Sequence, residues 1–357
     1  MTTKKDIESA LMRGADTLRD TIDAANYKDY VLPVMFVKYL SDSYTDAVEE
    51  LSKQYSGIRL ERQKKYLPFM VAEGCSFYDL YQQRFADNIG QLMNAAMRQI
   101  EADNNQQLAG VLSAVDYNSE NALGTREHKN AILRDLLEDF EPLDLRPSAI
   151  EVKEGQVPAD VIGDAYEYMI GQFASMAGKK AGSFYTPAAV SEIMARIVDV
   201  QPGERVYDPT CGSGSLLIKA AKKQNSKEVS IYGQEVNGSS VAMAKMNMYI
   251  HEIRDAKIGW GDTLANPVFL DADGNLLLFD AIVANMPFSK DKWASGFNPG
   301  GESSGKGKKE FKMEASLDKF HRFDWGVPPA SKGDWAFLLH MIASLSVNGR
   351  IAAVAPH

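Results

Sequence analysis

The chain has 357 residues, of which 45% are apolar and 24% charged, and this composition is that of a globular protein with room for two domains. No apolar run approaches the roughly 18–20 residues that span a bilayer, and the first residues lack the apolar core of a signal peptide. The two cysteines, Cys75 and Cys211, provide neither a disulfide framework nor a zinc site, so we expect a reducing cytoplasm and no metal. The net charge of −9 argues against a chain that binds a nucleic-acid backbone over its whole surface.

The first 155 residues predict a helical domain. Ile7, Leu11, Ala15 and Leu18 place one apolar stripe on a helix. Helical patterns follow over residues 32–40, where Pro33 is compatible with a helix only near its start, and over residues 85–100 and 129–140. Prolines and polar residues between 141 and 158 break the periodicity and predict a domain boundary near residue 155.

The second part of the chain predicts an α/β domain with a mainly parallel sheet. Short β-rich runs at 205–207, 229–232, 280–284 and 350–355 alternate with helical segments at 164–176, 188–198, 215–223, 239–251 and 335–345. A doubly wound sheet needs further elements to cover its edge. We therefore expect that the C-terminal part of this domain is missing from the chain or is supplied by a partner.

A glycine-rich loop joins the first predicted strand to a helix, in the sequence Asp208-Pro209-Thr210-Cys211-Gly212-Ser213-Gly214-Ser215. Its glycines allow a tight turn and a close approach of a ligand to the backbone. The dinucleotide fingerprint requires a small residue where Leu217 stands, and Asp208 would repel a pyrophosphate, which disfavours a nicotinamide oxidoreductase. Asp208 instead suits a cofactor with a cationic amino group and a sulfonium, as in S-adenosylmethionine.

Two further carboxylates stand where such a cofactor needs them. Glu235 ends the second predicted strand, where it can accept hydrogen bonds from both ribose hydroxyls. Asp262 follows the next crossover and can accept from the adenine amino group. Each alone is also typical of a surface or helix-capping acid, but their order behind the glycine-rich loop favours a cofactor site.

The sequence Asn285-Met286-Pro287-Phe288 follows an apolar run at residues 276–284 and is expected at the carboxyl end of a strand. An amino group conjugated with a ring or a carbonyl is a poor nucleophile because its lone pair is delocalised. The Asn285 side-chain oxygen and the Met286 carbonyl can hold its hydrogens, while Phe288 stacks on the planar face. Residues 289–312 follow with six lysines against three acids, which predicts a mobile basic loop beside the pocket or a solvated surface loop.

The glycine-rich loop, followed downstream by Asn285 to Phe288, resembles the motifs of amino-group DNA methyltransferases. With Phe184-Tyr185-Thr186-Pro187 before both, and with its helical first part, the chain resembles the modification subunit of bacterial type I restriction-modification systems. This resemblance implies a helical domain over residues 1–155. It also implies a class I, Rossmann-like S-adenosylmethionine-dependent methyltransferase domain over residues 156–357, incomplete at its C-terminus.

The resemblance also implies residue roles. Asn285 to Phe288 serve the target base and Glu235 and Asp262 serve the cofactor, as above. The methionine end of the cofactor and its backbone contacts fall to a larger set, namely Ser183, Phe184, Tyr185, Thr186, Pro187, Asp208, Gly212, Ser213, Gly214 and Ser215. The chain departs from the family at Met286, where the usual motif has proline. This departure leaves open a catalytically impaired scaffold that binds the cofactor and docks a specificity subunit.

The implied reaction is methyl transfer from S-adenosylmethionine to N6 of a flipped adenine, with adenine preferred over cytosine on the resemblance alone. Neither cysteine lies in the Pro-Cys setting of a C5-cytosine methyltransferase. The implied partners are DNA, a specificity subunit that binds two copies of this chain, and a restriction/translocase subunit. A protein-glutamine N5 methyltransferase stays an alternative because a side-chain amide poses the same lone-pair problem.

Overall fold

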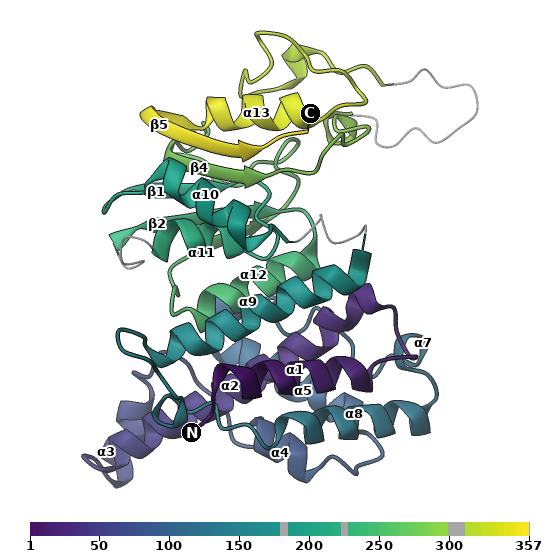
Figure 1. Cartoon of the computed structure of the whole chain (residues 1–357), viewed down its shortest axis with the longest axis vertical. Coiled ribbons are helices and arrows are strands. Elements are labelled where there is room, and N and C mark those ends of the chain that lie inside the picture. The colour runs from purple at the N-terminus through teal and green to yellow at the C-terminus, as the bar shows by residue number, and fades with distance from the viewer. Residues whose placement is uncertain (179–184, 223–227, 299–310, 357) are drawn as a thin grey trace. The chain divides into compact units, whose positions relative to one another are not determined.

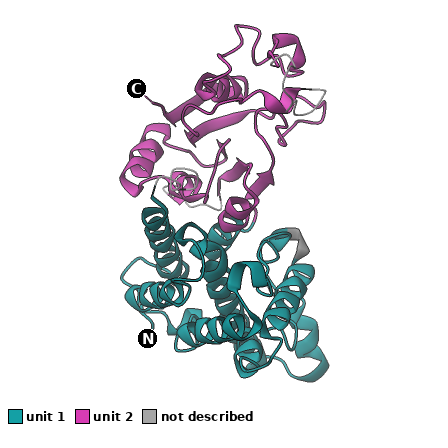
Figure 2. Ribbon diagram, turned by 90° about the vertical axis from the view of Figure 1, so that its right-hand side faces the viewer, with its two compact units in different colours: residues 1–181, 245–254 teal, residues 182–244, 255–357 magenta. Residues whose placement is uncertain are grey.

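The computed structural model describes residues 1–178, 185–222, 228–298 and 311–356 (Figure 1). The chain divides into two compact units, which Figure 2 colours separately. Unit 1 contains residues 1–181 and 245–254, and unit 2 contains residues 182–244 and 255–357. Unit 1 thus includes more than the first 155 residues; the division of the chain into family domains at residue 155 stays a prediction.

Unit 1 is helical, as the sequence predicts. Its first helix begins at a capping box, in which Thr3 accepts from the Asp6 amide (3.2 Å) and Asp6 accepts from the Thr3 amide (2.8 Å). The pattern predicted from residue 85 begins later in the structure, because Phe85 lies before the helix and is exposed. The helices are α1 (Lys4–Thr17), α2 (Tyr27–Ser52), α3 (Gly57–Lys64), α4 (Phe77–Gln82), α5 (Ile89–Asp103), α6 (Asn105–Leu108), α7 (Glu120–Leu123), α8 (Arg126–Phe140) and α9 (Pro158–Ala177).

Pro33 does not mark a helix start, and this expectation is wrong. Helix α2 begins at Tyr27, so Pro33 lies in its second turn and removes a backbone hydrogen bond there. An interior proline costs a helix about 3 kcal/mol. Nearly every residue of α2 from Tyr27 to Ser43 is buried, and the burial of these side chains offsets that cost.

Helix α12 (Gly238–Ile250) begins in unit 2 and ends in unit 1. From Ser240 to its end, every residue of α12 is buried except Lys245, which is half-buried. This is expected for a helix without a polar face. In unit 1 the ring of Tyr249 packs edge-on against Phe36 (5.6 Å between centroids) and Phe69 (5.9 Å). The segment 245–254 therefore completes the core of a unit from which it is distant in sequence.

Unit 2 contains a five-stranded parallel sheet, as predicted. In spatial order its strands are β3, β2, β1, β4 and β5. Strand β3 is not predicted from the sequence, because it is an edge strand that lacks a continuous buried run. The strands are β1 (Arg205–Asp208), β2 (Ser230–Glu235), β3 (Lys257–Trp260), β4 (Phe279–Asn285) and β5 (Leu345–Val354).

Helices cover both faces of this sheet (Figure 1). Tyr207 and Ile282 belong to a buried cluster with Phe337 and Met341 of α13 (Asp334–Ala343). The neighbouring strand residues point to the opposite face because side chains alternate along a strand, and there α10 (Ala188–Val198) and α11 (Ser215–Lys222) contact the strands. Unit 2 is therefore a doubly wound α/β structure. In the described part of the chain, no helix has both the length and the apolarity to cross a membrane.

Candidate functional site

The carboxyl ends of the strands bring the predicted site residues to one edge of the sheet. Asp208, Glu235 and Asn285 are the last residues of β1, β2 and β4, and all neighbouring strands are parallel. The chain moves from β1 to β2 on one side, whereas β4 pairs with β1 on the other. Open α/β sheets bind ligands at such a switch point.

The glycine-rich loop has the backbone geometry that its sequence predicts. Gly212 and Gly214 have φ angles of 52° and 76°, in the region that favours glycine. The Gly212 amide donates to Glu235 Oε2 (3.1 Å), which ties the loop to the end of β2. The hydroxyl oxygens of the buried Ser213 and Ser215 lie 3.0 Å apart. The loop is thereby fixed at the edge where β1 and β2 end.

Asp208 is a buried carboxyl, only 2% exposed. Its Oδ1 accepts from the Thr210 amide (2.8 Å). Burial raises the pKa of Asp208 to about 8 against this opposing hydrogen bond, and the charge of Glu235 adds to the rise. A carboxyl in such a setting gains its charge readily only beside a cation, and this fits a ligand that carries positive charge.

Glu235 is held from both sides by backbone amides. Besides the bond from Gly212, its Oε1 accepts from the Asn237 amide (2.8 Å). Burial raises the pKa of Glu235, and these backbone hydrogen bonds oppose the rise. Each carboxylate oxygen keeps a further lone pair for a hydroxyl group. The carboxylate is therefore oriented before any ligand arrives.

Asp262 follows β3 and divides its two oxygens between different partners. Oδ1 accepts from the amides of Leu264 (2.9 Å) and Ala265 (3.3 Å). Oδ2 lies 3.8 Å from Nζ of Lys290. The contact of Lys290 with Asp262 could not be predicted from the sequence, because the pair joins residues from two separate loops.

Two apolar side chains beside these acids were also missed. Val236 is 56% exposed and Trp260 is 70% exposed, and the Trp260 indole donates to the Val236 carbonyl (3.0 Å). Each is a large apolar residue next to, or two residues before, a predicted cofactor carboxylate. That adjacency was a sequence signal for a surface on which a flat ring packs.

The structure joins two motifs that are far apart in sequence. Nδ2 of Asn285 donates to Oγ1 of Thr186 (3.2 Å), across 99 residues. This bond orients the amide and leaves its oxygen as an acceptor. Tyr185 is half-buried, and Pro187 caps the start of α10. Ser183 and Phe184 lie outside the described residues.

The target motif separates into a buried and an exposed part. The Met286 side chain is 1% exposed and belongs to the core cluster with Tyr207 and Trp293. Pro287 is exposed, and Phe288 is 49% exposed. The departure from the family motif at Met286 therefore places its new side chain in the core, while the aromatic ring stays accessible for stacking.

Backbone hydrogen bonds fix the start of the predicted basic loop. The Ser289 amide donates to Asp334 Oδ1 (2.9 Å), and the Lys290 carbonyl accepts from the Gly333 amide (3.1 Å). The Lys292 amide donates to the Ala330 carbonyl (3.1 Å). Ser289, Lys290 and Lys292 are therefore anchored to the segment just before α13 and to its first residue. The rest of the predicted loop, residues 299–310, lies outside the described residues.

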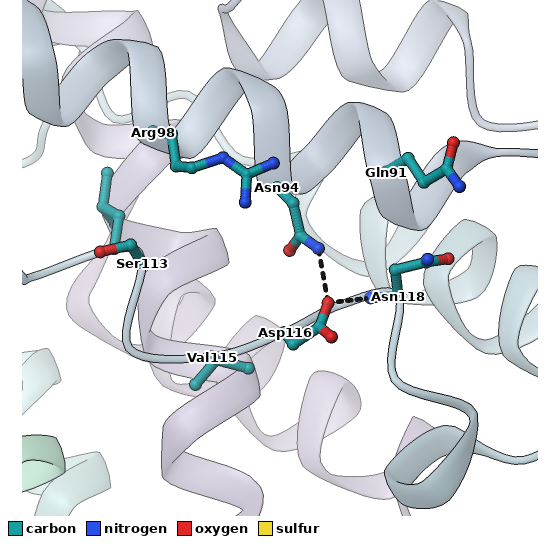
Figure 3. Close-up of a pocket in the computed structure, with 8 residues that line it drawn as sticks. Gln91, Asn94, Arg98, Ser113, Val115, Asp116 and Asn118 are labelled. Atoms are coloured by element: carbon teal, nitrogen blue, oxygen red, sulfur yellow. Dashed lines mark hydrogen bonds between the residues drawn. The ribbon is translucent and has the colours of Figure 1, made fainter.

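A separate pocket of about 320 Å³ lies in unit 1 (Figure 3). Its one carboxylate, on Asp116, accepts from Asn94 Nδ2 (2.6 Å) and from the Asn118 amide (2.8 Å). None of the predicted site residues lines it. Within the residues that the structure describes, no group of three or more His, Cys, Asp or Glu side chains is placed to hold a metal ion. The pocket is lined by Gln91, Asn94, Arg98, Leu112, Ser113, Val115, Asp116 and Asn118.

Comparisons with known proteins identify the family of the chain. The family model for N-6 DNA methylases matches residues 157–357, and the model for the HsdM N-terminal domain matches residues 7–140. The type I restriction enzyme MjaVIII methylase subunit of Methanocaldococcus jannaschii is 29% identical over 92% of this chain and 53% of its own length. The MpnII methylase subunit of Mycoplasma pneumoniae is 29% identical over 98% of this chain and 67% of its own length. The chain thus spans between half and two thirds of these relatives.

A solved structure extends the likeness to the fold. The type I restriction-modification system methyltransferase subunit from Streptococcus thermophilus is 30% identical, with a TM-score of 0.76 over 99% of this chain and 75% of that one. The family model covers more than half of the chain, and relatives and solved structure carry the same description. The chain therefore belongs to the N-6 DNA methylase family, among the modification subunits of type I restriction-modification systems.

Proposed function

We propose that this chain transfers a methyl group from S-adenosylmethionine to N6 of an adenine flipped out of DNA, as part of a cytoplasmic type I complex. The observation that carries the proposal is the bond between Asn285 and Thr186, which fixes an amide acceptor at the sheet edge that also ends in Asp208 and Glu235. The carboxylates proposed to bind the cofactor and the amide proposed to bind the target amino group thus lie at the same edge of the sheet.

The residues at this edge fit the proposed cofactor. When bound, S-adenosylmethionine supplies an electrophilic methyl group on a cationic sulfur. Asp208 offers a buried carboxyl whose ionised form a cation favours, and the fixed carboxylate of Glu235 accepts from the ribose hydroxyls. Asp262 Oδ2 accepts from the adenine amino group, and Val236 and Trp260 pack on the adenine ring. The predicted residues around Tyr185, Thr186 and the glycine-rich loop take the methionine end.

Asn285 and Phe288 act on the target base. A base within a duplex must be extruded at a cost of a few kcal/mol, and stacking on an aromatic ring returns about 1–3 kcal/mol. The Asn285 oxygen and the Met286 carbonyl hold the two amino hydrogens, and this moves the nitrogen toward tetrahedral geometry. Its lone pair would then point at the methyl carbon, so that an N–C bond would form as the S–C bond breaks, S-adenosylhomocysteine would leave, and the amino nitrogen would give one proton to water. No covalent enzyme intermediate would be needed.

We further propose that a separate specificity subunit reads the DNA sequence. Support comes from the net charge of −9, which is unsuited to a chain that binds the DNA backbone over a large surface. In this proposal one specificity subunit binds two copies of the chain, and a restriction/translocase subunit joins for cleavage. The relatives are each described as a subunit of a type I restriction enzyme.

Co-expression with a specificity subunit that is encoded by a neighbouring gene tests the proposed function. The purified complex is incubated with labelled S-adenosylmethionine and bacterial DNA, and modified bases are mapped by single-molecule sequencing. We expect N6-methyladenine at a defined sequence. Label in release factors instead of DNA would favour the glutamine methyltransferase. Cofactor binding without any transfer would favour the scaffold, and binding of NADH instead of S-adenosylmethionine would favour the oxidoreductase.

A further inference from the structure

Lys290 connects the proposed cofactor site to the loop that follows the target motif. Its Nζ lies 3.8 Å from Asp262 Oδ2, and both side chains are about a third exposed. Burial raises the pKa of Glu235, and the positive charge of Lys290 opposes this rise only after the backbone hydrogen bonds to the carboxylate. The lysine therefore contacts a carboxylate of the proposed cofactor site, although it belongs to the loop that follows Phe288.

The backbone of Lys290 is fixed while its charged end is not. Its carbonyl accepts from the Gly333 amide (3.1 Å), and the preceding Ser289 amide donates to Asp334 (2.9 Å). A separation of 3.8 Å exceeds hydrogen-bond length, and a partly exposed ion pair of this kind is weak. The side chain can therefore leave Asp262 without any change in the loop.

A second donor at Oδ2 of Asp262 shares that oxygen with Lys290 and so weakens their ion pair, which is already 3.8 Å long. Oδ1 already accepts from Leu264 and Ala265, so an amino group that approaches Asp262 must use Oδ2, where Lys290 lies. The adenine amino group of the cofactor is such a donor. This step rests on the proposed function, in which Asp262 holds the adenine.

We propose that Lys290 is a positioning residue that couples cofactor binding to DNA binding. Without cofactor, Lys290 pairs with Asp262. When the cofactor's amino group takes Oδ2, the lysine is released and contacts a DNA phosphate beside Phe288. Since coupling between two ligands is reciprocal, cofactor and DNA each tighten the binding of the other by the same factor.

The test measures this coupling with S-adenosylhomocysteine, which prevents turnover, and a duplex with a mismatched adenine. The protein is the complex with its specificity subunit. Calorimetry gives the affinity for S-adenosylhomocysteine with and without DNA, and fluorescence anisotropy gives the affinity for DNA over a range of salt concentrations. In the wild type we expect a several-fold coupling and, with cofactor present, a salt dependence steeper by about 0.9, the value for one phosphate contact.

In Lys290→Met we expect the coupling factor to fall toward one and the extra salt dependence to vanish. Affinity for S-adenosylhomocysteine without DNA should be unchanged or several-fold tighter, because the competing cation is gone. Lys290→Arg should restore the coupling. Lys292→Met is the matched control, since Lys292 is exposed on the same loop, and it should keep the coupling.

Three results would overturn the inference. One is unchanged coupling in Lys290→Met, and another is an equal loss in Lys292→Met. The third is weaker binding of S-adenosylhomocysteine by Lys290→Met in the absence of DNA, which would make Lys290 a cofactor ligand. A wild-type complex that binds no S-adenosylhomocysteine would refute the proposed function itself, and a wild type that binds both ligands without coupling would refute only the role of Lys290.

Discussion

At the scale of single residues, the buried carboxyl of Asp208 should affect folding stability and cofactor binding in opposite directions as the pH changes. Burial raises the pKa of its carboxyl from 3.8 to about 8, so the folded protein holds a proton that the unfolded chain releases between these values. Stability falls with pH wherever the folded state binds more protons. The contribution of Asp208 is therefore fully present below about pH 4 and is lost as the pH rises toward 8.

The substitution Asp208→Asn should remove this pH dependence. An amide has the same shape and no charge, so it avoids the much larger cost of burying an ionised carboxylate. We expect a higher melting temperature than the wild type at pH 8 and a smaller difference at pH 5, measured by differential scanning calorimetry. A wild-type melting temperature that rises steadily from pH 5 to 8 by more than that of Asp208→Asn would contradict the argument.

Cofactor binding should show the opposite dependence on pH. If the cation of S-adenosylmethionine needs ionised Asp208, binding below pH 8 releases a proton from this carboxyl. The affinity for the cofactor then falls by up to about tenfold for each unit by which the pH is lowered. Calorimetry in buffers of different ionisation enthalpy measures this proton release directly. Asp208→Asn should bind weakly at every pH and should release no proton from this site.

Asn285 and Thr186 should differ in how they affect the reaction. Asn285→Ala removes one acceptor and should lower the rate of transfer by about 10²–10³-fold, by analogy with oxyanion-hole donors. Thr186→Val removes only the hydroxyl that orients the amide and should cost about one hydrogen bond, close to tenfold. Single-turnover rates measure both effects. Cofactor affinity of Asn285→Ala, measured by calorimetry, should stay near that of the wild type, and full activity in this variant would refute the mechanism.

At the residue scale, the positions of the proposed groups at strand ends could be predicted from the sequence, but their surroundings could not. The identities of Asp208, Glu235 and Asn285 followed from motif order, since each stands at the end of a recognisable strand. The burial of Met286 and the pair between Lys290 and Asp262 depend on how separate loops meet. No local pattern encodes such a meeting.

At the scale of elements, α9 meets the residue that follows α12 at a glycine. A Cβ on Gly163 would lie 2.1 Å from Cε1 of the buried His251 ring. Gly163→Ala therefore forces the ring to move and should destabilise unit 1 by about 1–3 kcal/mol, as overpacking does. Far-UV circular dichroism, which reports its helices, follows the thermal transition.

The double variant Gly163→Ala with His251→Ala provides the control. His251→Ala removes the ring that the added methyl group at position 163 would strike, so the double variant should lose less stability than the sum of the two single variants. Additive losses would mean that the contact between Gly163 and His251 does not limit packing there. His251→Ala alone should also lose stability, because it leaves a cavity.

Long, well-patterned elements could be predicted, and elements that depend on their neighbours could not. Helix α8 and strand β4 were recognised because each carries a clear apolar pattern. Strand β3 has only half-buried and exposed residues and owes its conformation to pairing with β2. Pro33 was misjudged because local helix rules do not include the burial that holds α2 together.

At the scale of the whole molecule, the single helix α12 contributes residues to both units. Its first half counts with unit 2 and its second half with unit 1. Helix formation is cooperative, so melting one half removes support from the other. No contiguous division of the sequence could have predicted this arrangement, because residues 245–254 join a unit whose other residues precede them by more than sixty positions.

The tryptophans allow this coupling to be measured. Trp260, Trp293, Trp325 and Trp335 all lie in unit 2, so tryptophan fluorescence reports that unit alone. Tyr249→Ala removes a ring that packs on Phe36 and Phe69 within unit 1. We expect it to lower the midpoint of the fluorescence transition together with that of circular dichroism. A fluorescence midpoint equal to that of the wild type would show that the units unfold independently.

The shared helix also limits how such proteins exchange parts by recombination. A crossover near residue 155 would join the helical domain of one parent to the α12 of another, and Tyr249 and His251 would then meet a core that was selected with different partners. Viable hybrids should therefore keep residues 245–254 from the parent that supplies the helical domain, or match that parent closely there. A single breakpoint cannot satisfy this condition, so functional chimeras are expected to need either three junctions or closely related parents.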